Sequence, residues 1–242
     1  MGRRPEEGAG ISDVRRGLRA LADSVRAEIL QRFFKTGEGE YGEGDRFLGL
    51  RVPQVRTVAR RYRDLERKAL LELLESPWHE ERLLALLILV DQYRRGTGPE
   101  REAIHRLYLS NTRHINNWDL VDSSAEHIVG PHLDPQHLDG LEELARSSSV
   151  WERRIAMMAT FHWIKRGVFD PALQIAERLV RDDHDLIHKA VGWMLREVGK
   201  RDRAREEAFL RKNYRMMPRV MLRYALEHFP EAQRQEYLRG DV

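Results

Sequence analysis

The sequence predicts an all-α protein, on the strength of three observations. Apolar residues recur at intervals of three and four, the spacing of one helix face. Polar capping residues stand beside prolines at several expected helix starts. No stretch sustains the two-residue alternation of a half-buried strand. With 242 residues, 41% of them hydrophobic, the chain is long enough to bury a substantial core.

The first clear helical segment spans residues 22–33, where Val25, Ile29 and Phe33 repeat at intervals of four. Ala22 and Leu30 complete the apolar face of this segment. It is followed by an irregular stretch, residues 36–49, in which five positions are glycine. A loop of this length inside a compact domain is either functional or mobile.

Three later helices are predicted from a polar residue followed by proline. Proline suits the first helical position because its missing N–H would have no partner there. These pairs are Ser76-Pro77 before the apolar run at Leu83, Asp134-Pro135 before a segment ending at Ala145, and Asp170-Pro171 before a segment ending at Val180.

The helices also repeat. A basic residue followed three positions later by a small or apolar one recurs in the second helix of successive pairs, and an intermediate unit falls at Trp118. The four instances are Arg82 to Ala85, Arg153 to Ala156, Lys189 to Gly192 and Arg219 to Leu222. A two-helix period in the thirties to forties predicts a curved, HEAT-like α-solenoid with a concave surface. The alternative is an ordinary helical bundle with chance similarity.

Composition narrows the functional classes. The chain has no cysteine, which excludes disulfides, Cys-based zinc sites and thiol catalysis. No metal-binding histidine motif and no phosphate-binding glycine loop occurs, so we expect neither a metal nor a cofactor. No apolar run approaches the length of a membrane span. We therefore expect a soluble, cytoplasmic, monomeric protein with one domain over residues 1–242 and a flexible tail over residues 1–12.

The formal net charge of +3 conceals an uneven distribution. Residues 46–63 hold six arginines and no acid, whereas residues 64–150 hold 9 basic and 16 acidic side chains, a balance of −7. Residues 186–223 hold 11 basic and 4 acidic side chains, a balance of +7. Two separated basic blocks favour a polyanionic partner. Solvated helix faces in an arginine-rich chain are the alternative explanation.

The densest polar and aromatic cluster covers residues 116–122. If a helix starts here, Trp118 and Asp122 stand four positions apart and project from one face. An indole ring beside a carboxylate is a plausible site for a cationic ligand. The alternative is that Asn116 or Asn117 caps the helix and Trp118 packs in the core.

Two further clusters carry basic residues. Arg153 and Arg154 are adjacent in sequence, so they cannot share one helix face and only one can point to an inner surface. Lys189, Trp193 and Arg196 follow helical spacing and alternate base, aromatic, base, a combination that suits a nucleic-acid backbone. The alternative for this last stripe is a core tryptophan flanked by long cationic side chains.

Together these clusters resemble the DNA alkylation repair family of HEAT-like alkylpurine DNA glycosylases, the AlkD-like proteins. The resemblance covers roughly residues 20–230, and the run INNWDLVD is its most specific part. Four stretches carry it: residues 41–53 (YGEGDRFLGLRVP), 79–89 (HEERLLALLIL), 115–122 (INNWDLVD) and 189–197 (KAVGWMLRE).

The resemblance implies roles for individual residues. The family's active-site Trp–Asp pair falls on Trp118 and Asp122, its second cleft tryptophan on Trp193, and its DNA-contacting arginine on Arg154. Lys189, Arg196, Arg51 and Arg56 from the basic blocks are expected to bind DNA as well. A cleft tyrosine of some members is absent here, since the matching region contains Phe33 and Phe34.

The implied activity is hydrolysis of the N-glycosidic bond of N3- or N7-alkylated purines in duplex DNA, without strand cleavage. Alkylation makes the base cationic and a good leaving group, so the carboxylate of Asp122 would stabilise the positive charge that develops on the sugar. The family resemblance also implies that the base stays in the stack. Two alternatives remain: a non-catalytic protein that binds DNA structures, and a protein-interaction solenoid.

Overall fold

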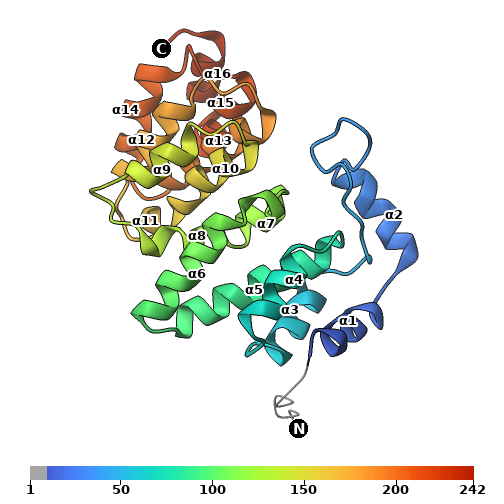
Figure 1. The fold of residues 1–242 in the computed structure, drawn as a ribbon. Helices are drawn as coiled ribbons and strands as arrows, with labels where there is room; N and C mark the ends of the chain where they lie inside the picture. The colour runs from blue at the N-terminus through green and yellow to red at the C-terminus, as the bar shows by residue number, and fades with distance from the viewer. Residues whose placement is uncertain (1–9) are drawn as a thin grey trace. The chain divides into compact units, whose positions relative to one another are not determined.

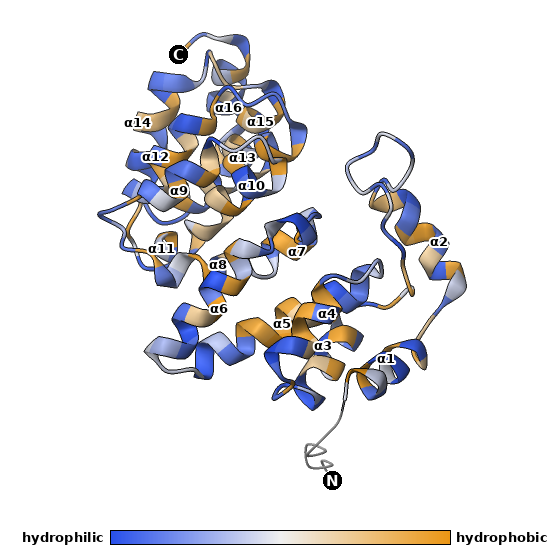
Figure 2. Cartoon of the chain, in the orientation of Figure 1, coloured by the Kyte–Doolittle hydropathy of each residue, from blue (hydrophilic) through white to orange (hydrophobic). Residues whose placement is uncertain are grey.

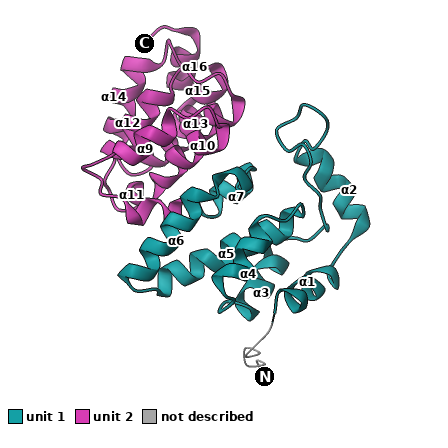
Figure 3. Cartoon of the chain, viewed as in Figure 1, with its two compact units in different colours: residues 1–124 teal, residues 125–242 magenta. Residues whose placement is uncertain are grey.

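The computed structural model describes residues 10–242, and the regular secondary structure of this part of the chain is helical, apart from one isolated β-bridge between Arg46 and Trp78 (Figure 1). The all-α prediction is confirmed. Most of the expected tail, residues 1–9, lies outside the described residues, whereas Ile11 and Ser12 already belong to the first helix. The chain divides into two compact units, residues 1–124 and 125–242 (Figure 3).

Unit 1 is built around one long helix, α5. Buried leucines and isoleucine line it from Leu83 to Leu89, and it carries strongly hydrophobic residues in Figure 2. Helices α1, α3, α4, α6 and α7 all pack against it. The helices of this unit are α1 (Ile11–Arg19), α2 (Ser24–Phe33), α3 (Val52–Arg61), α4 (Arg67–Leu74), α5 (His79–Arg95), α6 (Gly98–Ser110) and α7 (Trp118–Asp122), with a 3-10 turn at Thr112–His114.

Unit 2 is built around α10 and α13, which pack against each other. Helices α8 and α9 flank α10, whereas α14 and α15 flank α13. The helices are α8 (Ala125–Ile128), α9 (Asp139–Ala145), α10 (Val150–Ala159), α11 (Phe161–Ile164), α12 (Asp170–Leu179), α13 (Asp185–Gly199), α14 (Arg203–Asn213), α15 (Arg219–Ala225) and α16 (Glu231–Arg239), with 3-10 turns at Gly130–His132 and Leu226–His228.

The repeated sequence pattern falls on α5, α10, α13 and α15. Its small residue marks a close helix crossing in α13, where a Cβ added to Gly192 would lie 2.4 Å from the carbonyl oxygen of Met221 and 2.5 Å from Cβ of Tyr224. Ala85 and Ala156 occupy the equivalent, fully buried positions of α5 and α10. The small residue of the pattern is thus a packing residue, and the solenoid curvature stays a prediction.

The three proline-marked helix starts have different outcomes. Helix α12 begins at Asp170, one residue before the predicted Pro171, so that Phe169 rather than Asp170 is its N-cap, and it ends one residue before Val180. The prediction for Ser76-Pro77 is wrong, because α5 begins only at His79. The hydroxyl of Ser76 instead accepts a hydrogen bond from the backbone N–H of Trp78 at 3.1 Å, which closes a turn before the helix.

The start predicted at Asp134-Pro135 is also wrong. Asp134 accepts a hydrogen bond from the backbone N–H of Gln136 at 2.9 Å, so the residues form a turn and α9 begins at Asp139. Short polar side chains that bond to the backbone two residues further on favour turns as well as helix caps. Sequence alone does not separate the two outcomes.

Candidate active site

The candidate site of unit 1 centres on α7, a helix of five residues that begins with Trp118 and ends with Asp122. Both side chains are half-buried. Asn117 is buried and caps the helix, since its side-chain oxygen accepts the backbone N–H of Trp118 at 2.9 Å. A single helical turn is not stable alone in water. The position of α7 therefore depends on contacts with the rest of unit 1.

A buried polar network holds the N-terminal end of α7. Asp45, from the glycine-rich loop, accepts hydrogen bonds from Arg82 at 2.6 Å and from the amide of Asn117 at 3.2 Å. His79 lies between two carboxylates: its Nδ1 is 3.2 Å from Asp45 and its Nε2 is 2.8 Å from Asp119. The network joins the loop, α5 and α7 through side chains with little exposure to water.

The network is ionic at neutral pH. Burial opposes a charged imidazole, but the negative charge of Asp119 and hydrogen bonds to Asp119 and Asp45 outweigh it and raise the pKa of His79 to about 9. Burial also opposes ionisation of Asp45, yet the hydrogen bond to His79 and the charges of Arg82 and His79 lower the pKa of this carboxyl. Two cations and two carboxylates therefore share one small volume, and removing any one of them would leave an uncompensated buried charge.

Aromatic rings cover this network on the side of Trp118. The Trp118 indole stacks on Phe34 with centroids 5.3 Å apart, and Phe34 stacks on Phe47 at 5.0 Å. Phe47 in turn stacks on the His79 ring at 4.6 Å. Phe33 meets Trp118 edge to face at 6.0 Å, although this phenylalanine is 60% exposed. Phe33 and Phe34, which stand in the region where some family members have a cleft tyrosine, thus both contact Trp118.

The C-terminal end of α7 is held separately. The hydroxyl of Ser124 donates to the carbonyl oxygen of Leu120 at 2.6 Å and lies 2.9 Å from the hydroxyl of Tyr108. Tyr108 is fully buried, and burial raises the pKa of its phenol well above the usual value. Both ends of the short helix are consequently fixed by buried side chains from other elements.

The glycine-rich loop is anchored in its second half. The buried carboxylate of Glu80 accepts three backbone N–H groups, from Leu48 at 2.9 Å, Gly49 at 2.9 Å and Leu50 at 3.1 Å. Gly49 has φ +87°, and a Cβ there would lie 2.0 Å from the carbonyl oxygen of Asp23, so this position requires glycine. These contacts keep Asp45 and Phe47 in place beside α7.

The remaining residues of the implied family site lie in unit 2. Trp193 is half-buried on α13, with its ring 6.0 Å from that of Phe161. Arg154, on α10, is only 4% exposed and donates a hydrogen bond to the carbonyl oxygen of Leu186. Its neighbour Arg153 forms a two-point ion pair with Asp182, at 2.6 and 3.3 Å. The two arginines thus have different environments, because adjacent residues of a helix point to different faces.

The other predicted DNA-binding cations are spread over both units. On α13, Lys189 forms an ion pair with Asp185 at 2.6 Å and Arg196 pairs with Glu227. Arg51, the N-cap residue of α3, and Arg56, in the middle of the helix, are exposed. Arg56 also lines a cavity of about 330 Å³ whose other charged residues are Arg60, Arg63, Asp91 and Arg94.

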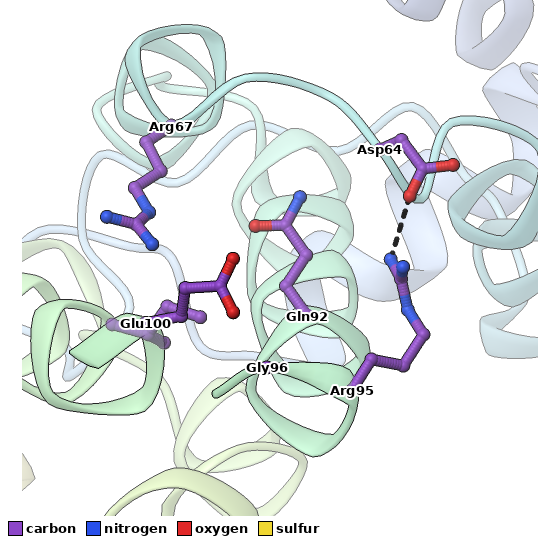
Figure 4. A pocket seen from close by; sticks show the side chains of 7 residues that line it. Asp64, Arg67, Gln92, Arg95, Gly96 and Glu100 are labelled. Atoms are coloured by element: carbon purple, nitrogen blue, oxygen red, sulfur yellow. Dashed lines mark hydrogen bonds and ion pairs between the residues drawn. The ribbon is translucent and has the colours of Figure 1, made fainter. Parts of the chain in front are cut away.

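Another pocket of unit 1, of about 230 Å³, carries charges of both signs (Figure 4). Arg95 pairs with Asp64 across it at 3.0 Å. Glu100 accepts hydrogen bonds from the backbone and hydroxyl of Thr97, which lower the pKa of its carboxyl. The two arginines of the pocket, Arg67 and Arg95, are matched in number by Asp64 and Glu100, so the pocket carries no net charge and is a poor match for a polyanion.

Sequence reasoning named Trp118 and Asp122 but assigned nothing to the side chains that hold them. Asp45 and His79 lie inside two of the stretches that carry the family resemblance, and Asp119 lies inside a third. Asp45 is one of four acidic residues in the glycine-rich loop, and nothing in the sequence indicates which of them has a partner far along the chain. Among residues 10–242, no group of three histidine or acidic side chains is placed to hold a metal ion. None of the described helices is both long and apolar enough to cross a membrane.

The fold and site define an all-helical protein with an aromatic and carboxylate-bearing turn supported by a buried ion network. The family model for DNA alkylation repair enzymes matches residues 14–229. The chain therefore belongs to the DNA alkylation repair enzyme family.

Solved structures agree on the fold. A predicted DNA alkylation repair enzyme from Enterococcus faecalis superposes with a TM-score of 0.65 at 15% sequence identity, covering 87% of this chain and 97% of that one. The protein smu.31 from Streptococcus mutans UA159 gives a TM-score of 0.55 at 17% identity, covering 91% and 99%. No match was found among curated proteins.

Proposed function

We propose that this DNA alkylation repair protein is a monofunctional DNA glycosylase that hydrolyses the N-glycosidic bond of cationic N3- and N7-alkylated purines in duplex DNA. The observation that carries the proposal is that Trp118 and Asp122 are the first and last residues of one short helical turn that is fixed at both ends. A charge-stabilising group accelerates a reaction most when it is already positioned before the charge develops.

The chemistry follows from the substrate. Alkylation puts a positive charge on the purine, so the base leaves as a neutral molecule and needs little acid catalysis. The deoxyribose gains oxocarbenium character as the bond breaks, and the carboxylate of Asp122 would stabilise this charge and orient the attacking water. The ring faces of Trp118 and Trp193 would add cation–π stabilisation.

In this proposal duplex DNA is held by its backbone, and the damaged base stays in the stack. Arg154 is only 4% exposed and donates to the carbonyl oxygen of Leu186, so its proposed contact with a phosphate near the lesion requires its side chain to leave that carbonyl when DNA binds. Lys189, Arg196, Arg51 and Arg56 would supply further phosphate contacts. Lys189 and Arg196 already have acidic partners. Their contribution to DNA binding would therefore include exchange of these ion pairs for phosphate.

The test is release of 7-methylguanine from duplex DNA under single-turnover conditions with enzyme in excess. We expect Asp122→Asn to lower the rate constant by at least about tenfold, because it removes the stabilising charge but keeps the shape. Asp139→Asn is the matched control, since Asp139 is an exposed first-turn residue of α9. Equal release by wild type and Asp122→Asn would exclude the proposed role of Asp122.

DNA affinity measured against salt concentration separates the alternatives. A protein that neutralises several phosphates loses affinity steeply as salt rises, because counterions are released on binding. Tight, salt-sensitive binding without base release would favour a non-catalytic protein that binds DNA structures. Weak binding that does not respond to salt would favour a protein-interaction solenoid.

A further inference from the structure

We propose that His79 is a positioning residue for the reaction: held between Asp45 and Asp119, it fixes the orientation of the α7 turn that carries Trp118 and Asp122. This inference rests on the proposed function for its activity readout. Its structural part, the control of α7 by His79, can be measured without any substrate.

The first argument is where His79 lies. Its side chain is 2% exposed and is faced by groups from each element packed against it: Asp45 of the loop, Asp119 of α7 and Arg82 of α5, together with the rings of Phe34 and Phe47. Both ring nitrogens are engaged, one by each carboxylate. A neutral histidine cannot donate from both nitrogens, so a protonated ring fits this geometry.

The second argument is an asymmetry between the two carboxylates. Asp45 has Arg82 and Asn117 as further donors and would stay paired without His79. For Asp119, one oxygen lies 2.8 Å from His79, while the other is buried with no hydrogen-bond partner. Loss of the imidazolium would leave the Asp119 carboxylate without its cation. An unpaired, largely buried charge is strongly unfavourable, so the turn would shift to bring it to water.

The third argument is the shortness of α7. Asp119 directly follows Trp118 and stands three residues before Asp122, so a shift of Asp119 moves the whole turn. Displacing a catalytic group by about 1 Å can cost about 100-fold in rate. The bond from His79 to Asp119 therefore determines the geometry of the proposed catalytic pair without His79 touching the substrate.

The structural test uses the indole N–H signals of the tryptophans in NMR spectra, assigned by single Trp→Phe variants. We expect His79→Gln to shift or broaden the Trp118 signal while leaving the Trp193 signal of unit 2 in place. We also expect the wild-type Trp118 signal to titrate with the His79 ring as the pH is raised. His137→Gln is the matched control, because His137 is paired with Asp134 at the same 2.8 Å but lies on the surface. An unchanged Trp118 signal in His79→Gln would overturn the proposal.

The activity test is a double-mutant cycle on 7-methylguanine release. We expect His79→Gln to lower the single-turnover rate by about 10- to 100-fold with DNA affinity unchanged within about twofold. In an Asp122→Asn background the same substitution is expected to have little further effect, because the two groups act as a unit. Equal losses in both backgrounds would show a general structural effect and refute the positioning role.

Asp119→Asn provides a second route if His79→Gln fails to fold, because Asp119 is less deeply buried. It removes the same charge pair from the other side and is expected to disturb the Trp118 signal in the same way. If wild type releases no base while both variants still move the Trp118 signal, the proposed function fails and the control of α7 by His79 stands. If wild type is active and neither variant alters the Trp118 signal, the proposed function stands and the control of α7 by His79 fails.

Discussion

The anchoring of the glycine-rich loop by Glu80 gives a prediction with a magnitude that follows from the hydrogen bonds. Glu80→Ala removes the acceptor for three buried backbone N–H groups, those of Leu48, Gly49 and Leu50. A buried donor left without a partner costs roughly 1–3 kcal/mol. We therefore expect Glu80→Ala to lower the free energy of unfolding of unit 1 by about 3–9 kcal/mol. This is a large share of the roughly 5–15 kcal/mol that holds a typical domain folded.

A graded pair of variants sharpens the reasoning. Glu80→Gln keeps the oxygen that accepts from Gly49 and Leu50 but turns an NH₂ group toward the N–H of Leu48, so it should cost about 1–3 kcal/mol. Glu72→Ala is the control, because Glu72 is an exposed residue of α4, and should stay within about 0.5 kcal/mol of wild type.

Urea unfolding is the assay, followed through the indole N–H signals of Trp78 and Trp118, which both report on unit 1. The expected order of stability is wild type, then Glu80→Gln, then Glu80→Ala. A loss below about 1 kcal/mol for Glu80→Ala would mean that water or other groups satisfy the loop N–H donors, and that the loop is not anchored as described.

Two further predictions concern stability. The pKa of His79 is raised from 6.5 to about 9. The contribution of its charged ring to the free energy of unfolding is therefore fully present below pH 6.5 and is lost as the pH rises through about 9. Urea titrations across this range should show a loss on the order of 3 kcal/mol that is absent in His79→Gln, and a flat wild-type profile would contradict the ionic network. In unit 2, Gly192→Ala places a Cβ against Met221 and Tyr224. It should lower the free energy of unfolding by about 1–3 kcal/mol, which is measured as a lower thermal midpoint. The control Gly98→Ala enters open space, and a similar loss in both variants would contradict the close crossing of α13 and α15.

Helix content was predictable from the sequence because apolar residues repeat with the period of a helix. The run at Leu83 lies buried within α5, whereas the expected segment over residues 22–33 corresponds to α2, whose apolar residues Val25, Ile29 and Phe33 are at least 60% exposed. Two of the helix starts were not predictable. Ser76 and Asp134 have the chemistry of helix caps, but each bonds to a backbone N–H two residues later and forms a turn instead.

The candidate site was predictable only in part, for a similar physical reason. Trp118 and Asp122 are four residues apart, so helical geometry alone relates them. Their turn is held by Asp45 and His79, which are distant from it in the sequence. Asp45 and Asn117, for example, form a hydrogen bond although they are 72 residues apart. Such pairs are set by tertiary packing, and nothing in their local sequence indicates the partner.

The glycine-rich loop divides into halves that should differ in their tolerance of change in length. Residues 45–50 are fixed by Glu80 and by the ion network, so an added residue there would displace Asp45 or Phe47 from the site. At its tip, Gly39 has open space around it, whereas a Cβ added to the buried Gly42 would lie 2.4 Å from the carbonyl oxygen of Phe34 and 3.4 Å from the amide nitrogen of Asn117. Length variation, a fluorescent label or an inserted tag should therefore be accommodated at Gly39 but not at Gly42, and Gly39 offers a point of attachment near the site that leaves the network intact.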